Sequence, residues 1–225
     1  MGFTRGKAST CCYQHTTRDL RCIVHGDDFV FVGTEHELRW VQGRMEKSFL
    51  VKVIRQLGGD PSDLKELRVL NRVFRWTANG ILLEADPRHQ EILVAAEPGN
   101  ALLTPGVKEQ LLGELAETPL SAEATTWFRS EAARCNYLGL DRPDTAFPAK
   151  ELCRRMSVPE KASQLALQRL VRYLKGSPRL VYNYPWQPES ALDVLVDADF
   201  AGCQSTRRST SGGVALLGAH LILLC

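Results

Sequence analysis

The chain has 225 residues, of which 44% are hydrophobic and 24% charged, a balance typical of a soluble globular protein with a sizeable core. Its formal net charge of +2 is too small to indicate nucleic-acid binding by itself. No apolar run approaches the roughly 18 residues needed to span a bilayer, and the polar, basic segment that follows Met1 does not resemble a secretory signal, so no membrane association is expected. Seven irregularly spaced cysteines argue against a disulfide framework and favour an intracellular location, cytoplasmic or nuclear.

Two adjacent carboxylates stand between two apolar runs in the segment LRCIVHGDDFVFVG, residues 20–33. The β-branched and aromatic residues on either side of Gly26 predict two antiparallel strands joined by a tight turn. Asp27 and Asp28 at the tip would offer the oxygen ligands that Mg²⁺ (or Mn²⁺) prefers, although side-chain alternation predicts that only one points fully at a shared metal. A plain solvated hairpin explains the same residues, because Gly-Asp is a common turn dipeptide.

A helix is predicted from about Thr34, which would be its N-cap, with Glu37 closing a capping box. The residues at helical spacing on its sheet-facing side are Leu38, Val41, Met45 and Phe49. After a break at 58–61, the sequence predicts one strand over about 67–76, a tight turn at Asn79-Gly80, a return strand over 81–83, and a helix over about 86–96.

Helical patterns follow near 121–139, 144–156 and 160–175, and strands return at about 180–184, 191–198 and 213–217. The last of these helices has an apolar face and an opposite face that carries Arg169, Arg172 and Lys175. Such basic residues are also typical of an ordinary solvated helix face. The closing apolar run, 221–225, has no visible partner strand and suggests a truncated chain.

Two cysteine–histidine pairs have the spacing of zinc ligands. They are Cys12-x-x-His15 and Cys22-x-x-His25. Both fall on expected strands, where residues three apart face opposite sides of the sheet. We therefore expect partly buried strand residues here and no zinc site.

The segment around Asp27 resembles the polymerase motif of reverse transcriptases, in which a Tyr-x-Asp-Asp turn carries catalytic metal ligands. The likeness is to the copia-type LTR retrotransposon Pol polyprotein, with His25 standing where that family has its tyrosine. The likeness continues along the chain in the same order, through GILLEADPRHQEIL to LLTPG, YLGLDRPDTAFPAKELCRRMSVPE, LQRLVRYLKGSPRLVYNY, and DVLVDADFAGCQSTRRSTSGGVALLGA.

This resemblance implies an α+β fold in three parts. They are an antiparallel palm-like sheet with packed helices over 1–100, a helical thumb or connection over 101–178, and a truncated ribonuclease H-like β start over 190–225. In the third part Asp197 matches the first metal-binding aspartate, and Asp199 is a weaker candidate on the same strand face. An upstream catalytic aspartate and the later ribonuclease H ligands have no match, so neither two-metal site is expected to be complete.

The implied function is that of a fragment of an RNA-directed DNA polymerase, a metal-dependent nucleotidyltransferase, with little or no activity expected of this chain alone. Its partners would be dNTPs and an RNA/DNA primer–template duplex. His25 would lie near the primer end, while Arg169, Arg172 and Lys175 would contact duplex phosphates.

One alternative is a decayed, non-enzymatic remnant of a transposable element that binds nucleic acid. The other is an unrelated metal-dependent phosphodiesterase using Asp27, Asp28 and an unidentified histidine. The sequence indicates no particular oligomeric state.

Overall fold

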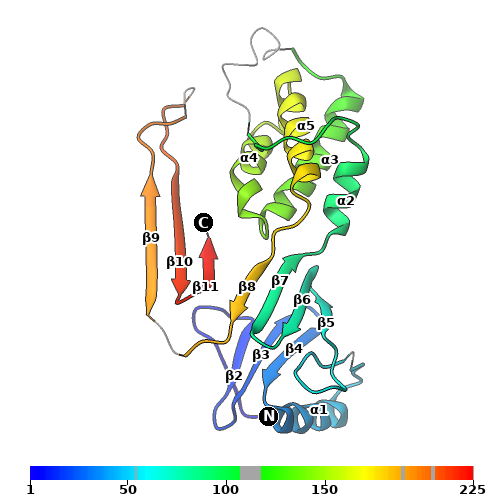
Figure 1. The fold of residues 1–225 in the computed structure, drawn as a ribbon, viewed down its shortest axis with the longest axis vertical. Helices are drawn as coiled ribbons and strands as arrows, with labels where there is room; N and C mark the ends of the chain where they lie inside the picture. Colours follow the sequence, from blue (N-terminus) through cyan, green and yellow to red (C-terminus); the bar gives the residue numbers. More distant parts are fainter. Residues whose placement is uncertain (54, 107–117, 189–190, 204–205, 225) are drawn as a thin grey trace. The chain divides into compact units, whose positions relative to one another are not determined.

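The structure is a computed structural model that describes residues 1–53, 55–106, 118–188, 191–203 and 206–224. The chain divides into two compact units, residues 1–55 and 56–225. Both contain antiparallel sheets, and the described ranges hold five helices in total, which confirms the expected α+β class (Figure 1). None of the helices in these ranges is long and apolar enough to cross a membrane. The expected domain boundaries near residues 100 and 178 stay predictions.

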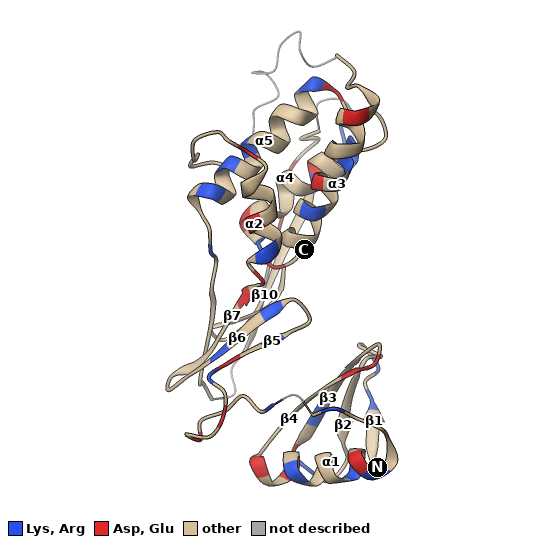
Figure 2. Ribbon diagram, turned by 90° about the vertical axis from the view of Figure 1, so that its right-hand side faces the viewer, with Lys and Arg blue, Asp and Glu red and all other residues tan. Residues whose placement is uncertain are grey.

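The first unit is a four-stranded antiparallel sheet with one helix packed against it. Its strands pair in chain order: β1 (Phe3–Arg5), β2 (Cys12–His15), β3 (Leu20–His25) and β4 (Asp28–Gly33). The helix α1 (Glu35–Ser48) runs across this sheet (Figure 2). Leu20 on the sheet and Val41 and Met45 on the helix are buried together, and Phe31 and Trp40 pack around them. The predicted hairpin over 20–33 is thus confirmed as β3 and β4, and its inner face is held by a small core of its own.

The start of α1 differs from the prediction. Thr34 stands at the N-cap position, but its side chain makes no capping hydrogen bond. Glu37 does not close a capping box, because its carboxylate accepts a hydrogen bond from Arg18 Nη1 at 2.7 Å. The Arg18 guanidinium lies 4.0 Å from the ring centroid of Trp40, so it joins the turn before β3 to the helix. Phe49, expected on the packed face, is the extended C-cap residue and is 53% exposed.

The second unit begins with an antiparallel sheet in the order β5-β6-β7-β8. Its strands are β5 (Glu66–Val69), β6 (Arg72–Thr77), β7 (Gly80–Ala85) and β8 (Tyr182–Pro185). The single strand predicted over about 67–76 was wrong, because Leu70 and Asn71 form a two-residue turn with φ values of 50° and 60°. Positive φ at both central residues is the geometry of a type I′ hairpin turn, which Asn favours and Leu does not. The tight turn predicted at Asn79-Gly80 is present but lies one residue earlier, because Thr77 pairs with Gly80 and Ala78 and Asn79 form the turn.

Four helices between β7 and β8 form the main core of the second unit. They are α2 (Arg88–Ala95), α3 (Ala122–Gly139), α4 (Pro143–Arg154) and α5 (Lys161–Gly176), each close to its predicted range. Phe128 of α3 and Leu167, Leu170 and Leu174 of α5 are fully buried in this core. Ser121 caps α3 by accepting a hydrogen bond from the Ala124 amide at 3.2 Å.

The last three strands form an antiparallel sheet in the order β11-β10-β9. They are β9 (Leu192–Ala198), β10 (Ser211–Leu217) and β11 (His220–Leu224). The expectation that the closing apolar run lacks a partner was wrong, because β11 pairs with β10 across a bulge. Every residue of β9 is exposed. Tyr184 of β8 donates a hydrogen bond to the Leu221 carbonyl at 3.1 Å, which connects this sheet to the preceding one.

Candidate functional site

The two central carboxylates stand at the tip of the β3–β4 hairpin. His25 ends β3 and pairs with Asp28, the first residue of β4, so Gly26 and Asp27 form a two-residue turn between them. Gly26 has a φ of +61°, a conformation that glycine adopts without the steric cost that a Cβ would bring. Regular pairing from Leu20 to His25 holds the turn in one register. The sheet therefore fixes Asp27 in the turn and Asp28 at the first position of β4.

Both carboxylates are exposed to solvent, as is His25. Within the described part of the chain, neither aspartate side chain has a hydrogen-bond or ion-pair partner. Mg²⁺ prefers oxygen ligands, so the two exposed carboxylates are ligands of the right chemical type for the expected ion. The described residues hold no group of three or more His, Cys, Asp or Glu side chains placed to share a metal. The turn therefore supplies at most two of the six ligands that Mg²⁺ usually takes.

Asp197 and Asp199 play different structural roles at the end of β9. Asp197 lies opposite Gly212 on β10, and its Oδ1 accepts a hydrogen bond from the Ala198 amide at 2.9 Å. Asp199 lies beyond the end of the strand, so the expectation that it shares a strand face with Asp197 was wrong. Its Oδ1 accepts hydrogen bonds from the amides of Gly202 and Thr210, at 3.2 and 2.8 Å. Asp199 thus fixes the connection to β10, while the metal-binding role of Asp197 stays a prediction.

The three basic residues expected to contact phosphates lie along α5 beside the segment that follows α2. Each donates a hydrogen bond to that segment: Arg169 to the Thr104 hydroxyl, Arg172 to the Asn100 carbonyl at 2.6 Å, and Lys175 to the Gly99 carbonyl at 3.1 Å. The Leu102 amide in turn donates to the Arg172 carbonyl at 3.0 Å. These side chains therefore hold residues 99–104 against the helix. In the view of Figure 2, basic and acidic residues are mixed over the described helices.

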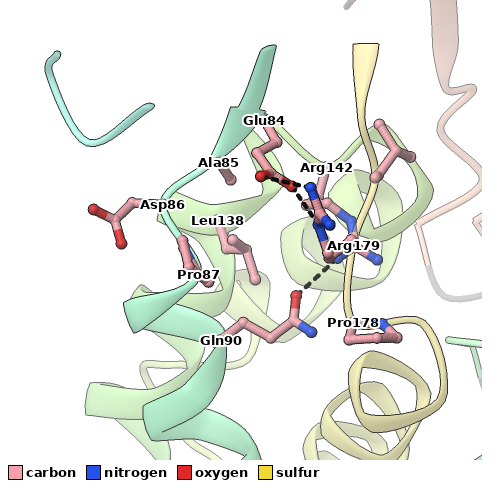
Figure 3. Close-up of a pocket in the computed structure, with 10 residues that line it drawn as sticks. Glu84, Ala85, Asp86, Pro87, Gln90, Leu138, Arg142, Pro178 and Arg179 are labelled. Carbon is pink, nitrogen blue, oxygen red and sulfur yellow. Dashed lines mark hydrogen bonds and ion pairs between the residues drawn. The ribbon is translucent and has the colours of Figure 1, made fainter. Parts of the chain in front are cut away.

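A buried arginine at the start of α4 was not anticipated from the sequence. Arg142 is 2% exposed and makes two hydrogen bonds to Asp144, at 3.0 and 2.7 Å. It also donates to the Gln90 side chain at 2.8 Å (Figure 3). A further hydrogen bond goes from its Nη2 to the Ser177 carbonyl at 2.9 Å. One guanidinium thus connects α2, α4 and the end of α5. Burial favours the neutral Asp144, but the bonds from Arg142 and Tyr173 outweigh it and lower the pKa of that carboxyl.

Two more buried carboxylates lie near this position, at the end of β7. Glu84 accepts hydrogen bonds from Arg179 at 2.8 and 2.9 Å and also from Arg75. Burial alone would raise the pKa of Glu84, but the hydrogen bonds from Arg179 and Arg75 outweigh it and the pKa is lowered. Asp86 is held by Arg88, whose hydrogen bonds are the largest cause of the lowered pKa of Asp86. Figure 3 shows the bonds between Glu84 and Arg179. Both carboxylates already bind arginines, and we assign this cluster a structural role.

Known proteins with related sequences come from Arabidopsis thaliana. The chain is 39% identical over 97 residues to an uncharacterized mitochondrial protein, covering 42% of this chain and 40% of that protein. It is 28% identical over 130 residues to the retrovirus-related Pol polyprotein from transposon RE1, covering 58% of this chain and 8% of the polyprotein. A second uncharacterized mitochondrial protein is 31% identical over 81 residues, or 36% of this chain and 73% of that protein. The chain belongs to the copia-type retrotransposon Pol family.

This membership confirms the resemblance inferred from the sequence motifs. The chain spans less than half of the first mitochondrial relative and under a tenth of the RE1 polyprotein. No family model matches the chain. No solved structure matches it.

Proposed function

We propose that this Pol-family chain carries part of a reverse transcriptase and that Asp27 and Asp28 hold Mg²⁺ (or Mn²⁺) in the polymerase site. The observation that carries the proposal is the pair of exposed carboxylates at the tip of a regular hairpin, which have no partner among the residues that the structure describes. A bound Mg²⁺ would supply Lewis-acid chemistry that favours the deprotonated primer 3′-hydroxyl and stabilises developing phosphate charge. The hairpin contributes by presenting both carboxylates in a fixed position, with the exposed His25 beside them for contact with the primer end or the incoming nucleotide.

The isolated chain should hold the metal weakly and extend primers little or not at all. The reason is the number of ligands, because no third candidate side chain joins Asp27 and Asp28 within the described ranges. Two-metal phosphoryl transfer requires ligands that clamp both the attacking and the leaving oxygen. Mg²⁺-dependent primer extension by the isolated chain, abolished by Asp27→Asn, would refute this expectation of inactivity and at the same time support the polymerase assignment.

The metal-binding part of the proposal can be tested separately from activity. Mn²⁺ added to isotope-labelled protein should broaden the amide NMR signals of residues 25–29 selectively, because paramagnetic relaxation falls steeply with distance. The double substitution Asp27→Asn/Asp28→Asn should remove this broadening. Asp19→Asn, which changes an exposed aspartate at the other end of β3, should leave it unchanged. Broadening that survives the double substitution, or that never centres on the turn, would contradict the proposal.

The nucleic-acid partner is the second part of the proposal. A primer–template duplex would be held mainly through its phosphates, so the logarithm of the affinity should fall linearly with the logarithm of salt concentration. Arg169, Arg172 and Lys175 each donate one hydrogen bond to the segment 99–104. The further N–H groups of these three side chains remain for phosphate oxygens. Replacing all three with glutamine should reduce the salt slope by about 3. Binding with an unchanged slope would place the contact elsewhere, and absence of binding at low salt would remove this partner and the non-enzymatic binding alternative together.

A further inference from the structure

Two adjacent cysteines lie where the connection between β1 and β2 ends, outside the aspartate turn: Cys11 is the last residue of the connection and Cys12 is the first residue of β2. Cys12 Sγ donates a hydrogen bond to the Ser9 hydroxyl oxygen at 3.3 Å, and Cys11 Sγ is also 3.3 Å from that oxygen. Both sulfur atoms therefore approach the same oxygen. Cys11 is exposed and Cys12 is partly exposed, so a ligand from solvent reaches the pair without opening the core.

The loop that carries these thiols is closed by its own hydrogen bonds. The Gly6 amide donates to the Cys12 carbonyl at 2.8 Å, and the Cys12 amide donates to the Ser9 carbonyl at 3.2 Å. Arg5 Nε donates to the Thr10 carbonyl at 2.7 Å. A Cβ at Gly6 would stand 2.7 Å from the Ser9 carbonyl oxygen, so the loop is also closely packed. The backbone that carries the two thiols is thus fixed by these contacts, and the Ser9 hydroxyl contacts both sulfur atoms.

The same environment favours the thiolate, which is the form of cysteine that binds metals. The hydrogen bond with Ser9 is the largest influence that lowers the pKa of the Cys11 thiol. A hydrogen bond with Cys12 and the charge of Arg5 act in the same direction and together with Ser9 outweigh burial. By contrast, burial raises the pKa of the nearby Cys22 thiol to about 11, so Cys22 stays protonated in the core.

The surroundings also limit the number of ligands. His15, three residues after Cys12, is buried, and its Nδ1 accepts hydrogen bonds from the amides of Thr17 and Arg18, both at 3.2 Å. No third His, Cys, Asp or Glu completes a metal-binding group with these thiols in the part of the chain that the structure describes. Tetrahedral Zn²⁺ normally takes four protein ligands in a structural site, so two thiols alone do not suit it.

We propose that Cys11 and Cys12 form a two-thiol binding site for a soft, thiophilic monovalent ion, with Cu⁺ as the biological representative. Soft thiolate ligands select Cu⁺, and two sulfur ligands are sufficient for this ion. Binding replaces the thiol protons with two sulfur–metal bonds and changes no oxidation state. The ion would bind at a fixed point of the fold, because the Cys11 carbonyl already accepts a hydrogen bond from the Val24 amide on β3 at 2.9 Å.

The test is Cu⁺ retention against a competing chromogenic Cu⁺ chelator, with oxygen excluded and the chain reduced. The wild-type chain should retain a single Cu⁺ ion, and Cys11→Ser and Cys12→Ser should each lose it. Cys203→Ser, which removes a thiol near Arg154 in the second unit, is the matched control and should retain the ion. Zn²⁺ in excess should not displace it.

Ser9→Ala provides a second, milder variant that keeps both thiols. Loss of the bridging hydroxyl should weaken Cu⁺ binding by about tenfold, the order expected for a group that hydrogen bonds to metal ligands. Circular dichroism of each variant establishes that the sheet is intact. The proposal is overturned if the wild-type chain releases Cu⁺ to the chelator, if either cysteine variant retains it, or if Cys203→Ser loses it.

Discussion

Replacing Arg142 with methionine should strongly destabilise the helical core of the second unit. The guanidinium is 2% exposed and donates to Asp144, Gln90 and the Ser177 carbonyl, so its loss leaves several acceptors with no partner. Removing one member of a buried ion pair typically costs 3–5 kcal/mol, because the other charge stays buried without compensation. The Asp144 side chain is 22% exposed and regains some hydration. We therefore expect a loss of about 3 kcal/mol in the free energy of unfolding.

Urea denaturation followed by circular dichroism measures this loss. The matched control is Arg154→Met, which removes an arginine whose ion pair with Glu151 is at the surface, with side chains 43% and 29% exposed. Surface pairs contribute about 0–1 kcal/mol, so the control should shift the midpoint only slightly. Both variants should keep the wild-type slope with denaturant, because the surface exposed on unfolding barely changes. A loss below about 1 kcal/mol for Arg142→Met would refute the reasoning that this arginine organises the core.

The same substitution should change how stability depends on pH. The pKa of Asp144 lies below its ordinary value of 3.8 in the folded chain, because the hydrogen bonds from Arg142 and Tyr173 outweigh the effect of burial. A lowered pKa in the folded state contributes stability above the ordinary pKa, and this contribution disappears as pH falls through the folded value. The free energy of unfolding of the wild-type chain should therefore decline below about pH 4. In Arg142→Met this decline should be smaller. If stability fell with pH equally in both proteins, Arg142 would not be a cause of the lowered pKa of Asp144.

Two further pairs of substitutions compare positions that look alike in the sequence, each measured by denaturation. Gly26→Ala should lower the free energy of unfolding by about 1–2 kcal/mol, the cost of a positive φ in a residue with a Cβ. No steric clash adds to it, because a Cβ there would meet nothing within 4 Å. Gly80→Ala should cost more, because its Cβ would meet the Tyr184 carbonyl oxygen at 2.2 Å; equal losses would contradict this. Ser121→Ala should cost about 1 kcal/mol for a lost helix cap, while Thr34→Ala should cost only a few tenths because Thr34 makes no capping bond.

Features with a local signal in the sequence were predicted well. The β3–β4 hairpin combines two apolar runs with a Gly-Asp turn, and the long helices combine apolar spacing with prolines near their ends. These signals depend on residues close in the chain, so they can be recognised without knowledge of the fold. The turn at Leu70 was missed because leucine gives no indication of positive φ, and the pairing of the neighbouring strands enforces that conformation.

Features that depend on distant partners could not be predicted in this way. Glu37 has the spacing of a capping box, but Arg18, 19 residues earlier, binds it instead. Arg142 has no local sequence signal for burial, and its partners Gln90 and Ser177 are far from it in the chain. Helical periodicity placed Arg172 opposite the apolar face but could not reveal that residues 99–104 lie there. Charged side chains are the least predictable because long-range pairing decides their roles.

The aspartate turn differs from these charged groups because its geometry does not depend on its charges. The β3–β4 pairing and the core formed by Leu20, Val41 and Met45 hold the hairpin, and no partner of either carboxylate contributes to that fold within the described residues. Neutralising Asp27 and Asp28 should therefore leave the unit folded and, if anything, relieve repulsion between two adjacent negative charges. Loss of metal binding in Asp27→Asn/Asp28→Asn can thus be attributed to the missing ligands. A loss of stability would instead indicate that the carboxylates serve the fold, which would weaken the case for a polymerase site.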